Sequence, residues 1–303
     1  MNNRCTPPLP LRDGVSPSYL WLPEGDWPDM ATFLVSHFPG VSAAEWAARM
    51  RAGEVVDQHG NPFHAHSPYR RGDCVYYYRT LDDEESIPVT ERILFQDEHL
   101  LVADKPHFLP VIPSGRFLQQ TLLVRLKKST GLEHLSPLHR IDRETAGLVL
   151  FSTDPSTRGL YQSMFQKKTM QKTYEAIAAS LRDTVFPITH CSRMIEGEPF
   201  FRMQEVPGTP NSETRIDCIE KRGELSLYRL NPVTGKRHQL RVHLAGLGMP
   251  ILNDQFYPHP VPVGHQDDFT KPLKLLAKAI SFTDPLSGLE RYFESRLSLD
   301  DAV

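Results

Sequence analysis

The sequence of 303 residues lacks the features that place a chain in a membrane or in a disulfide-stapled secreted scaffold. No run is long and apolar enough to span a bilayer, and the N-terminus has no charged segment followed by an apolar core, as a secretory signal would. The four cysteines are scattered and show no CxxC spacing. They indicate reduced thiols in a cytosolic protein, so we expect a cytoplasmic location.

An excess of positive charge is also missing. The formal net charge is −3, which argues against a large non-specific electrostatic footprint on nucleic acid. Contact with a polyanion would therefore depend on local basic clusters, which lie at residues 125–128, 167–172 and 236–241. Hydrophobic content of 40% and charged content of 23% are ordinary for a globular protein, and the length suggests about two domains.

The most informative segment is PLHRIDRETAGLVLFS at residues 137–152. Asp142 lies between Arg140 and Arg143, and the apolar run 148–151 that follows predicts a short buried strand. An adjacent cation keeps a carboxylate charged where desolvation alone would raise its pKa. The pattern therefore indicates either a reactive carboxylate at the start of a core strand or a solvated turn with a local ion pair.

A second informative block is NPVTGKRHQLRVHLAGLGMPILND at residues 231–254. Residues 233–235 predict a turn. Apolar and polar residues then alternate through residues 236–244, and this period of two predicts a strand. We expect its polar face to suit an anionic ligand, because it carries two arginines, a glutamine and a histidine.

Five motifs in this order resemble those of the RluA-type pseudouridine synthases. The resemblance covers roughly residues 90–297. Ala146 stands where this family usually has Ser, Phe108 where it has Gly, and Leu276 where it often has His. The matching segments are Asp97–Pro106 with Leu109–Pro113, His139–Asp142 with Thr145–Gly147, Lys172–Tyr174, Thr234–His243 and Leu275–Pro285.

The resemblance implies a mixed α/β (α+β) domain with a central, largely antiparallel sheet and flanking helices. It implies an isomerase that converts uridine to pseudouridine in RNA and needs no cofactor, because the reaction involves no redox change and no outside group. Asp142 is the expected catalytic carboxylate, as a nucleophile or as the base that gives a glycal. Arg241 is its expected buried cation, and Tyr174 is expected to stack on the target base.

Recognition of RNA is expected to need further side chains. A base inside folded RNA must leave its stack, and Arg140 resembles the residue that fills the vacated space. We also predict that Lys172, Arg237, His238 and Gln239 contact RNA. His139 is expected to satisfy backbone groups rather than to act as a base, and no metal site is expected. We expect this chain to be a monomer and its partner to be structured ribosomal or transfer RNA.

The chain is expected to have three parts. Residues 1–20 are rich in proline and predict an extended lead-in. Residues 21–86 resemble a degenerate αL-type RNA-binding module, with one helix from Pro28 to Phe38, a second capped by Ser42, a hairpin and a strand. Residues 88–303 form the expected catalytic domain.

Two other functions remain open. One is an RNA-binding protein without catalysis. The other is a hydrolytic enzyme that cleaves a nucleoside or glycosyl bond, and such enzymes usually need two carboxylates. Glu144 is near Asp142 in sequence, but its flanking arginine predicts that it is exposed.

Overall fold

A computed structural model describes residues 8–80, 84–181, 183–261 and 267–300. The chain divides into two compact units. The first contains the residues up to 85 with segments 113–119 and 124–133, and the second contains 86–112, 120–123 and the residues from 134 onward. The start of the proline-rich segment and part of the stretch before residue 86 lie outside the described residues, so the sequence-based domain boundaries stay a prediction.

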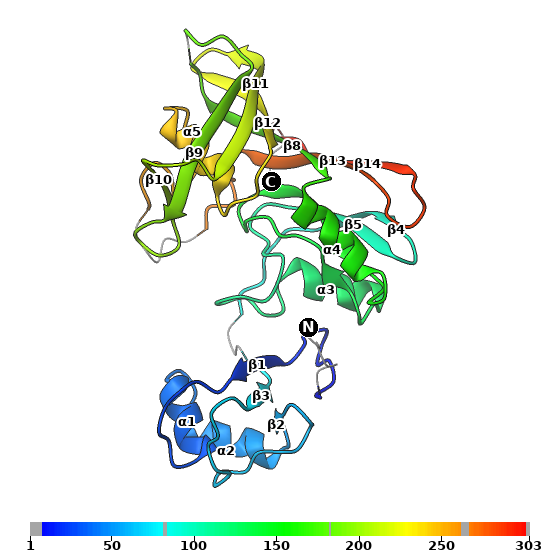
Figure 1. The fold of residues 1–303 in the computed structure, drawn as a ribbon, viewed down its shortest axis with the longest axis vertical. Helices are drawn as coiled ribbons and strands as arrows, with labels where there is room; N and C mark the ends of the chain where they lie inside the picture. Colours follow the sequence, from blue (N-terminus) through cyan, green and yellow to red (C-terminus); the bar gives the residue numbers. More distant parts are fainter. Residues whose placement is uncertain (1–7, 81–83, 182, 262–266, 301–303) are drawn as a thin grey trace. The chain divides into compact units, whose positions relative to one another are not determined.

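The first unit is a small antiparallel sheet with two helices (Figure 1). Its strands lie in the order β1-β3-β2. The elements are β1 (Ser18–Trp21), α1 (Met30–His37), α2 (Ala43–Arg51), β2 (Val55–Asp57) and β3 (Cys74–Tyr77). Phe33 and Leu34 of α1 and Trp46 of α2 are fully buried against Val75 and Tyr77 of β3, which makes one apolar core.

The helix starts of this unit follow capping chemistry. Ser42 accepts a hydrogen bond from the Glu45 amide and caps α2, as the sequence predicted. The predicted start of α1 at Pro28 is wrong, because Asp29 is the N-cap and accepts a hydrogen bond from the Thr32 amide. A carboxylate at this position satisfies an amide that would otherwise lack a partner, and so it fixes where the helix begins.

The second unit is built on an eleven-stranded sheet. Its main path is β10-β9-β11-β12-β8-β13-β7-β5-β4, with β14 paired to β13 and β6 paired to β7. The pairings are antiparallel except that β13 runs parallel to β7, which confirms the expected largely antiparallel sheet. The strands are β4 (Arg92–Gln96), β5 (Leu100–Lys105), β6 (Ser136–Pro137), β7 (Ala146–Ser152), β8 (Gln171–Ala179), β9 (Ile188–Glu196), β10 (Met203–Val206), β11 (Ser212–Arg222), β12 (Leu225–Pro232), β13 (Leu275–Thr283) and β14 (Glu290–Glu294).

Three further helices lie within the described residues. They are α3 (Leu122–Thr130), whose residues fall in both units, and α4 (Arg158–Lys167) and α5 (Gln239–Gly246), which belong to the second unit. Tyr161 and Met164 of α4 pack on apolar side chains of β5, β7 and β13. No described helix has the length and apolar character needed to cross a membrane.

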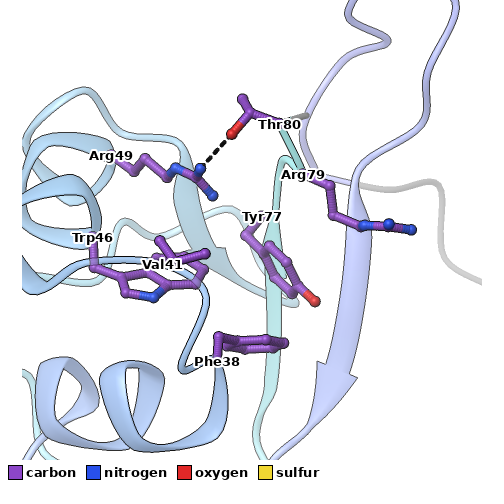
Figure 2. A pocket seen from close by; sticks show the side chains of 7 residues that line it. All are labelled: Phe38, Val41, Trp46, Arg49, Tyr77, Arg79 and Thr80. Atoms are coloured by element: carbon purple, nitrogen blue, oxygen red, sulfur yellow. Dashed lines mark hydrogen bonds between the residues drawn. The ribbon is translucent and has the colours of Figure 1, made fainter. Parts of the chain in front are cut away.

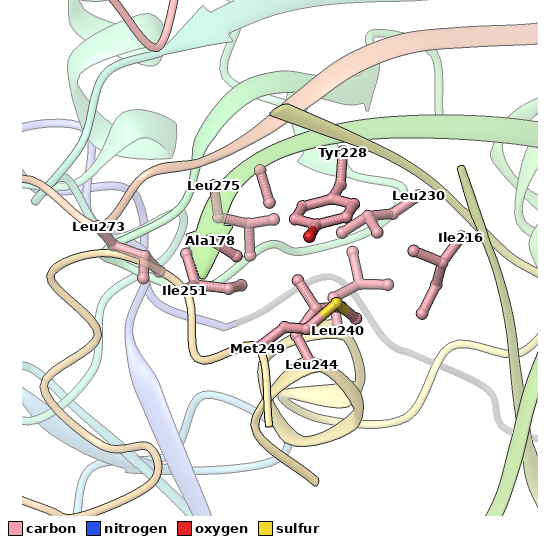
Figure 3. Packing of buried hydrophobic residues seen from close by; sticks show 11 residues of the cluster. Ala178, Ile216, Tyr228, Leu230, Leu240, Leu244, Met249, Ile251, Leu273 and Leu275 are labelled. Carbon is pink, nitrogen blue, oxygen red and sulfur yellow. The ribbon is translucent and has the colours of Figure 1, made fainter. Parts of the chain in front are cut away.

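Helix α5 is anchored in an apolar cluster around the middle strands. Figure 3 shows Leu240 and Leu244 of α5 close to Met249, facing Tyr228 and Leu230 of β12. Burial of each such side chain contributes about 1.5–3 kcal/mol. This packing fixes the rotation of α5 about its axis and therefore the direction in which its polar side chains point.

The strand predicted for residues 236–244 is wrong, because the chain is helical from Gln239. The side chains from Gln239 to Leu244 are all buried. A helix that is buried all round has no amphipathic stripe, so its sequence need not show a period of 3.6. The alternation of polar and apolar residues here reflects polar groups with partners inside the protein rather than a sheet face in solvent.

Replacement of Gly147 tests the close approach of β7 to β13. Gly147 has a φ of +109°, and a Cβ atom there would lie 2.7 Å from the backbone nitrogen of Ala277. We expect Gly147→Ala to lower the free energy of unfolding by about 3 kcal/mol or more, because both the backbone conformation and the space exclude a side chain. Urea denaturation measures the change.

The matched control is Gly159→Ala in α4, where a Cβ atom would meet no atom within 4 Å. It should change the free energy of unfolding by less than about 1 kcal/mol. Equal effects of the two substitutions would contradict this account of Gly147.

Candidate active site

Asp142 lies in the turn that leads into the buried strand β7. The amide of Thr145 donates a hydrogen bond to the Asp142 carbonyl oxygen, which closes the turn. The Asp142 side chain is 25% exposed, so its carboxylate is accessible to a ligand. The sequence expectation of a carboxylate at the start of a core strand is confirmed, because every residue of β7 is buried.

Arg241 of α5 is the cation at this site. Its side chain is 1% exposed, and its Nη1 atom donates a hydrogen bond to Asp142 Oδ2 at 3.2 Å. The planar fork formed by Nε and Nη2 binds Asp254 at 2.8 and 2.7 Å. Burial lowers the pKa of Arg241, but its ion pair with Asp254 outweighs this and raises the pKa above its ordinary value. The expected contact between Arg241 and Asp142 is present, although the two-pronged partner is Asp254.

Glu144 is a third carboxylate beside Arg241. Its side chain is only 14% exposed, and Oε2 lies 3.7 Å from Arg241 Nη1. The prediction that Glu144 is exposed is therefore wrong. The turn before β7 directs Glu144 and Asp142 toward the same guanidinium, although Arg143 lies between them in the sequence.

Lys105 supports the backbone under this turn. Its ammonium group is fully buried and donates hydrogen bonds to the carbonyl oxygens of Pro106, Leu109 and Arg143. Burial lowers the pKa of Lys105 to about 7, against the attraction of Glu144 and Asp142. Lys105 thus ties the end of β5 to the turn that carries Asp142.

Tyr174 comes from β8, which lies next to β13 in the sheet and one strand away from β7. Burial raises the pKa of Tyr174 above its ordinary value, and the charge of Asp142 adds to this shift. Its phenol is therefore protonated at neutral pH. Lys172, on the same strand, is half-buried, and burial lowers its pKa.

The residues predicted to contact RNA differ in burial. Arg140 and Arg237 are exposed. Gln239 is 4% exposed and donates hydrogen bonds to the Glu213 carbonyl oxygen and the Thr214 hydroxyl. The predicted RNA contact of Gln239 does not fit this placement, because its side chain holds the turn before α5 to β11.

His139 serves the backbone, as the sequence predicted. Its Nε2 atom accepts a hydrogen bond from the Leu150 amide at 3.1 Å, and its ring stacks on Phe165. Burial lowers the pKa of His139 to about 3, so the ring stays neutral at neutral pH. His139 therefore joins the segment before the turn to β7.

A group of possible metal ligands lies where α5 meets β9 and β10. His190, Glu205 and His243 bring their ligand atoms within 4.8 Å of one another. These atoms already have partners in the protein, because His190 Nε2 is 2.8 Å from Glu205 and His243 Nε2 is 2.9 Å from the Ser212 hydroxyl. The group acts as a polar clamp on α5, and the expected absence of a metal stays a prediction.

The first unit contains a small hollow of about 130 Å³. Figure 2 shows the rings of Phe38, Trp46 and Tyr77 around it, with Arg49 directed to Thr80. Arg49 is one of the two arginines of α2. It is 8% exposed and donates a hydrogen bond to the Tyr78 carbonyl oxygen. It therefore stabilises the unit itself, which leaves Arg51 as the exposed cation of α2.

Asp254, Glu144 and Lys105 were not predicted as parts of the site. Asp254 could have been found from the sequence, because it ends the motif block at residues 231–254 and a buried arginine needs a carboxylate fixed beside it. The sequence points less clearly to Glu144 and Lys105. Their roles depend on a turn whose shape cannot be read from residue spacing.

The sequence is similar to those of known RNA pseudouridine synthases. A family model described as RNA pseudouridylate synthase matches residues 99–246. An uncharacterized RNA pseudouridine synthase of Synechocystis is 30% identical over 226 residues, which cover 72% of this chain and 76% of that protein. The human pseudouridylate synthase RPUSD2 is 32% identical over 181 residues, 56% of this chain and 32% of that protein, so the match spans about a third of that relative's length.

A solved structure supports the fold. The human RNA pseudouridylate synthase domain containing 1 superposes with a TM-score of 0.56 at 20% identity, over 68% of this chain and 84% of that chain. This likeness confirms the expected mixed α/β architecture.

Removal of the Asp254 carboxylate tests the buried pair. We expect Asp254→Ala to lower the free energy of unfolding by about 3–5 kcal/mol, because it leaves the buried Arg241 guanidinium without its two-pronged partner. Denaturation at neutral pH measures the change. Asp300→Ala is the control, since Asp300 pairs with Arg222 at the surface with 60% of its side chain exposed. That change should cost less than about 1 kcal/mol, and an equally small effect at Asp254 would refute the buried pair as a source of stability.

Proposed function

This chain belongs to the RNA pseudouridylate synthase family, and we propose that it isomerises uridine to pseudouridine in structured RNA with Asp142 as the catalytic carboxylate. One observation carries the assignment of Asp142. A partly exposed carboxylate is held in hydrogen-bond contact with a fully buried guanidinium.

The reaction breaks a carbon–nitrogen glycosidic bond, turns the base over and forms a carbon–carbon bond. An ionised carboxylate next to the ribose serves either route, by attack on the sugar or by removal of a ribose proton. Arg241 holds the Asp142 carboxylate in place through the hydrogen bond from Nη1 to Oδ2. Because Arg241 is already fixed by Asp254, it needs no reorganisation when substrate binds.

Tyr174 fits a stacking role better than a role as a base. Burial and the charge of Asp142 raise the pKa of its phenol, so a phenolate is not available at neutral pH to remove the final proton from the base. A neutral ring presents a face on which a base can stack. Arg140 is exposed, as needed for a side chain that fills the gap left by a flipped base.

A hydrolytic reaction is the second candidate, because the structure brings Glu144 close to Asp142. Both carboxylates face Nη1 of Arg241, and two carboxylates are what glycoside hydrolysis usually requires. Incubation with RNA labelled with tritium in its uracil bases separates the two, since isomerisation gives pseudouridine and hydrolysis gives free uracil. If neither product forms, the chain is an RNA-binding protein without catalysis.

We propose ribosomal or transfer RNA as the substrate class.

The charge of Asp142 is tested by Asp142→Asn. We expect turnover to fall by at least about a thousandfold, because an amide of the same size supplies no anion at the ribose. RNA affinity and the unfolding transition should stay close to those of the wild type. Asp217→Asn is the control, since Asp217 is a partly exposed carboxylate on β11. Activity of Asp142→Asn within tenfold of the wild type would sink the assignment.

The geometry of the cation is tested by Arg241→Lys. Lysine keeps the charge but has no planar fork, so it cannot hold Asp254 with two prongs and also reach Asp142. We expect kcat to fall by at least about tenfold while the Kd for RNA changes by less than about threefold. The contrast is Arg237→Lys, an exposed position where binding should weaken and kcat should persist. Weaker binding at an unchanged kcat in Arg241→Lys would make Arg241 a phosphate contact.

A further inference from the structure

His238 has an unusual backbone conformation immediately before α5. Its φ is +55° and its ψ is +17°, in the left-handed region, and its side chain does not cap the helix. A residue other than glycine in this region is held there by its surroundings, and such residues cluster at functional sites. The His238 ring is also constrained, because it lies against Phe256 and meets the Tyr257 ring nearly at a right angle.

A chain of hydrogen bonds starts at β10 and ends on this ring. The Met203 amide donates to the Tyr257 hydroxyl oxygen at 2.8 Å, and this oxygen lies 2.9 Å from His238 Nδ1. Burial raises the pKa of Tyr257, so the phenol keeps its proton. Among the described residues, Met203 and His238 are the hydrogen-bond partners of this hydroxyl. Since the Met203 amide can only donate, the phenol proton is directed to His238 Nδ1.

The relay fixes the position of the proton on the imidazole. Burial lowers the pKa of His238, although Asp142 opposes this, so the ring is neutral at neutral pH. A neutral imidazole carries one N–H group. Because Nδ1 accepts from Tyr257, the proton must be on Nε2. That atom faces the candidate catalytic carboxylate and lies 3.8 Å from Asp142 Oδ1.

We propose that His238 is a positioning residue that presents an Nε2 proton to Asp142 through this relay. Arg241 holds Oδ2 of Asp142 and His238 faces Oδ1, so donors on both oxygens fix the plane of the carboxylate. The present separation exceeds a hydrogen bond by about 1 Å, and contacts of this kind often tighten only when substrate binds. This role rests on the proposed function.

Two substitutions at His238 separate the donor from the backbone conformation. His238→Gln places an amide N–H near the position of Nε2, whereas the amide of His238→Asn ends near Nδ1 and cannot reach Asp142. Asparagine adopts a left-handed backbone more readily than glutamine does. A loss of activity in His238→Asn that is absent in His238→Gln therefore cannot come from backbone strain. We expect kcat to fall by at least about tenfold in His238→Asn and by less than about threefold in His238→Gln.

The relay has its own variant and a matched control. Tyr257→Phe removes the donor to Nδ1, and Tyr228→Phe removes a second buried hydroxyl, which accepts from the Leu181 amide and donates to the Ala179 carbonyl oxygen away from the site. Nitrogen NMR of histidine-labelled protein, with His238 assigned from the His238→Gln spectrum, should show an Nε2–H tautomer in the wild type and in Tyr228→Phe. The tautomer should become mixed in Tyr257→Phe, with kcat reduced by about threefold or more.

Turnover by the wild type and its loss in Asp142→Asn establish first that the reaction is the proposed one. Absence of pseudouridine formation by the wild type would refute the proposed function, and the NMR tautomer would still decide the relay. Within an active enzyme, a wild-type kcat in His238→Asn would overturn the positioning role. A proton on Nδ1 in the wild type would overturn the relay.

Discussion

The burial of one guanidinium is the constraint on which the site depends. Arg241 is 1% exposed, so its charge must be balanced inside the protein. Asp254 provides the two-pronged partner, Asp142 and Glu144 approach Nη1, and the ring of Phe256 lies 4.7 Å away. Because these groups come from α5, the segment after it and the turn before β7, one cation holds together parts that are about a hundred residues apart in sequence.

The sheet brings these parts together by its strand order. β8, β13 and β7 are neighbours, so Tyr174 on β8 and the turn before β7 meet at one region of the sheet. The parallel pairing of β13 with β7 depends on Gly147, which has no side chain to collide with Ala277. The apolar contacts of Leu240 and Leu244 orient α5, and Arg241 lies between them in the sequence.

Burial assigns different tasks to neighbouring polar residues of one motif. Arg237 is exposed at the surface, where it donates hydrogen bonds to the Phe200 and Arg202 carbonyl oxygens. Gln239 and His243 are buried and bonded to side chains and backbone of β11. His238 lies between these two environments, with Nδ1 bonded to Tyr257 and Nε2 facing Asp142. The fold therefore gives neighbouring polar residues of one motif three different places. Arg237 lies at the surface, Gln239 and His243 hold α5 inside the protein, and His238 faces the Asp142 carboxylate.

The sequence by itself determined the buried strand after Asp142 and the cap of α2, because each depends on local pattern. The class of fold and the pairing of Asp142 with Arg241 followed from the resemblance of its motifs to those of a known family. The sequence did not determine that residues 239–246 are helical, that Glu144 is half-buried, or that Asp254 takes the arginine fork. Only the tertiary structure decided these, because they depend on which surfaces meet across the sheet. A helix that is buried on all sides, such as α5, shows no amphipathic period in its sequence. The burial of Glu144 depends on Arg241, which is far from it in the sequence.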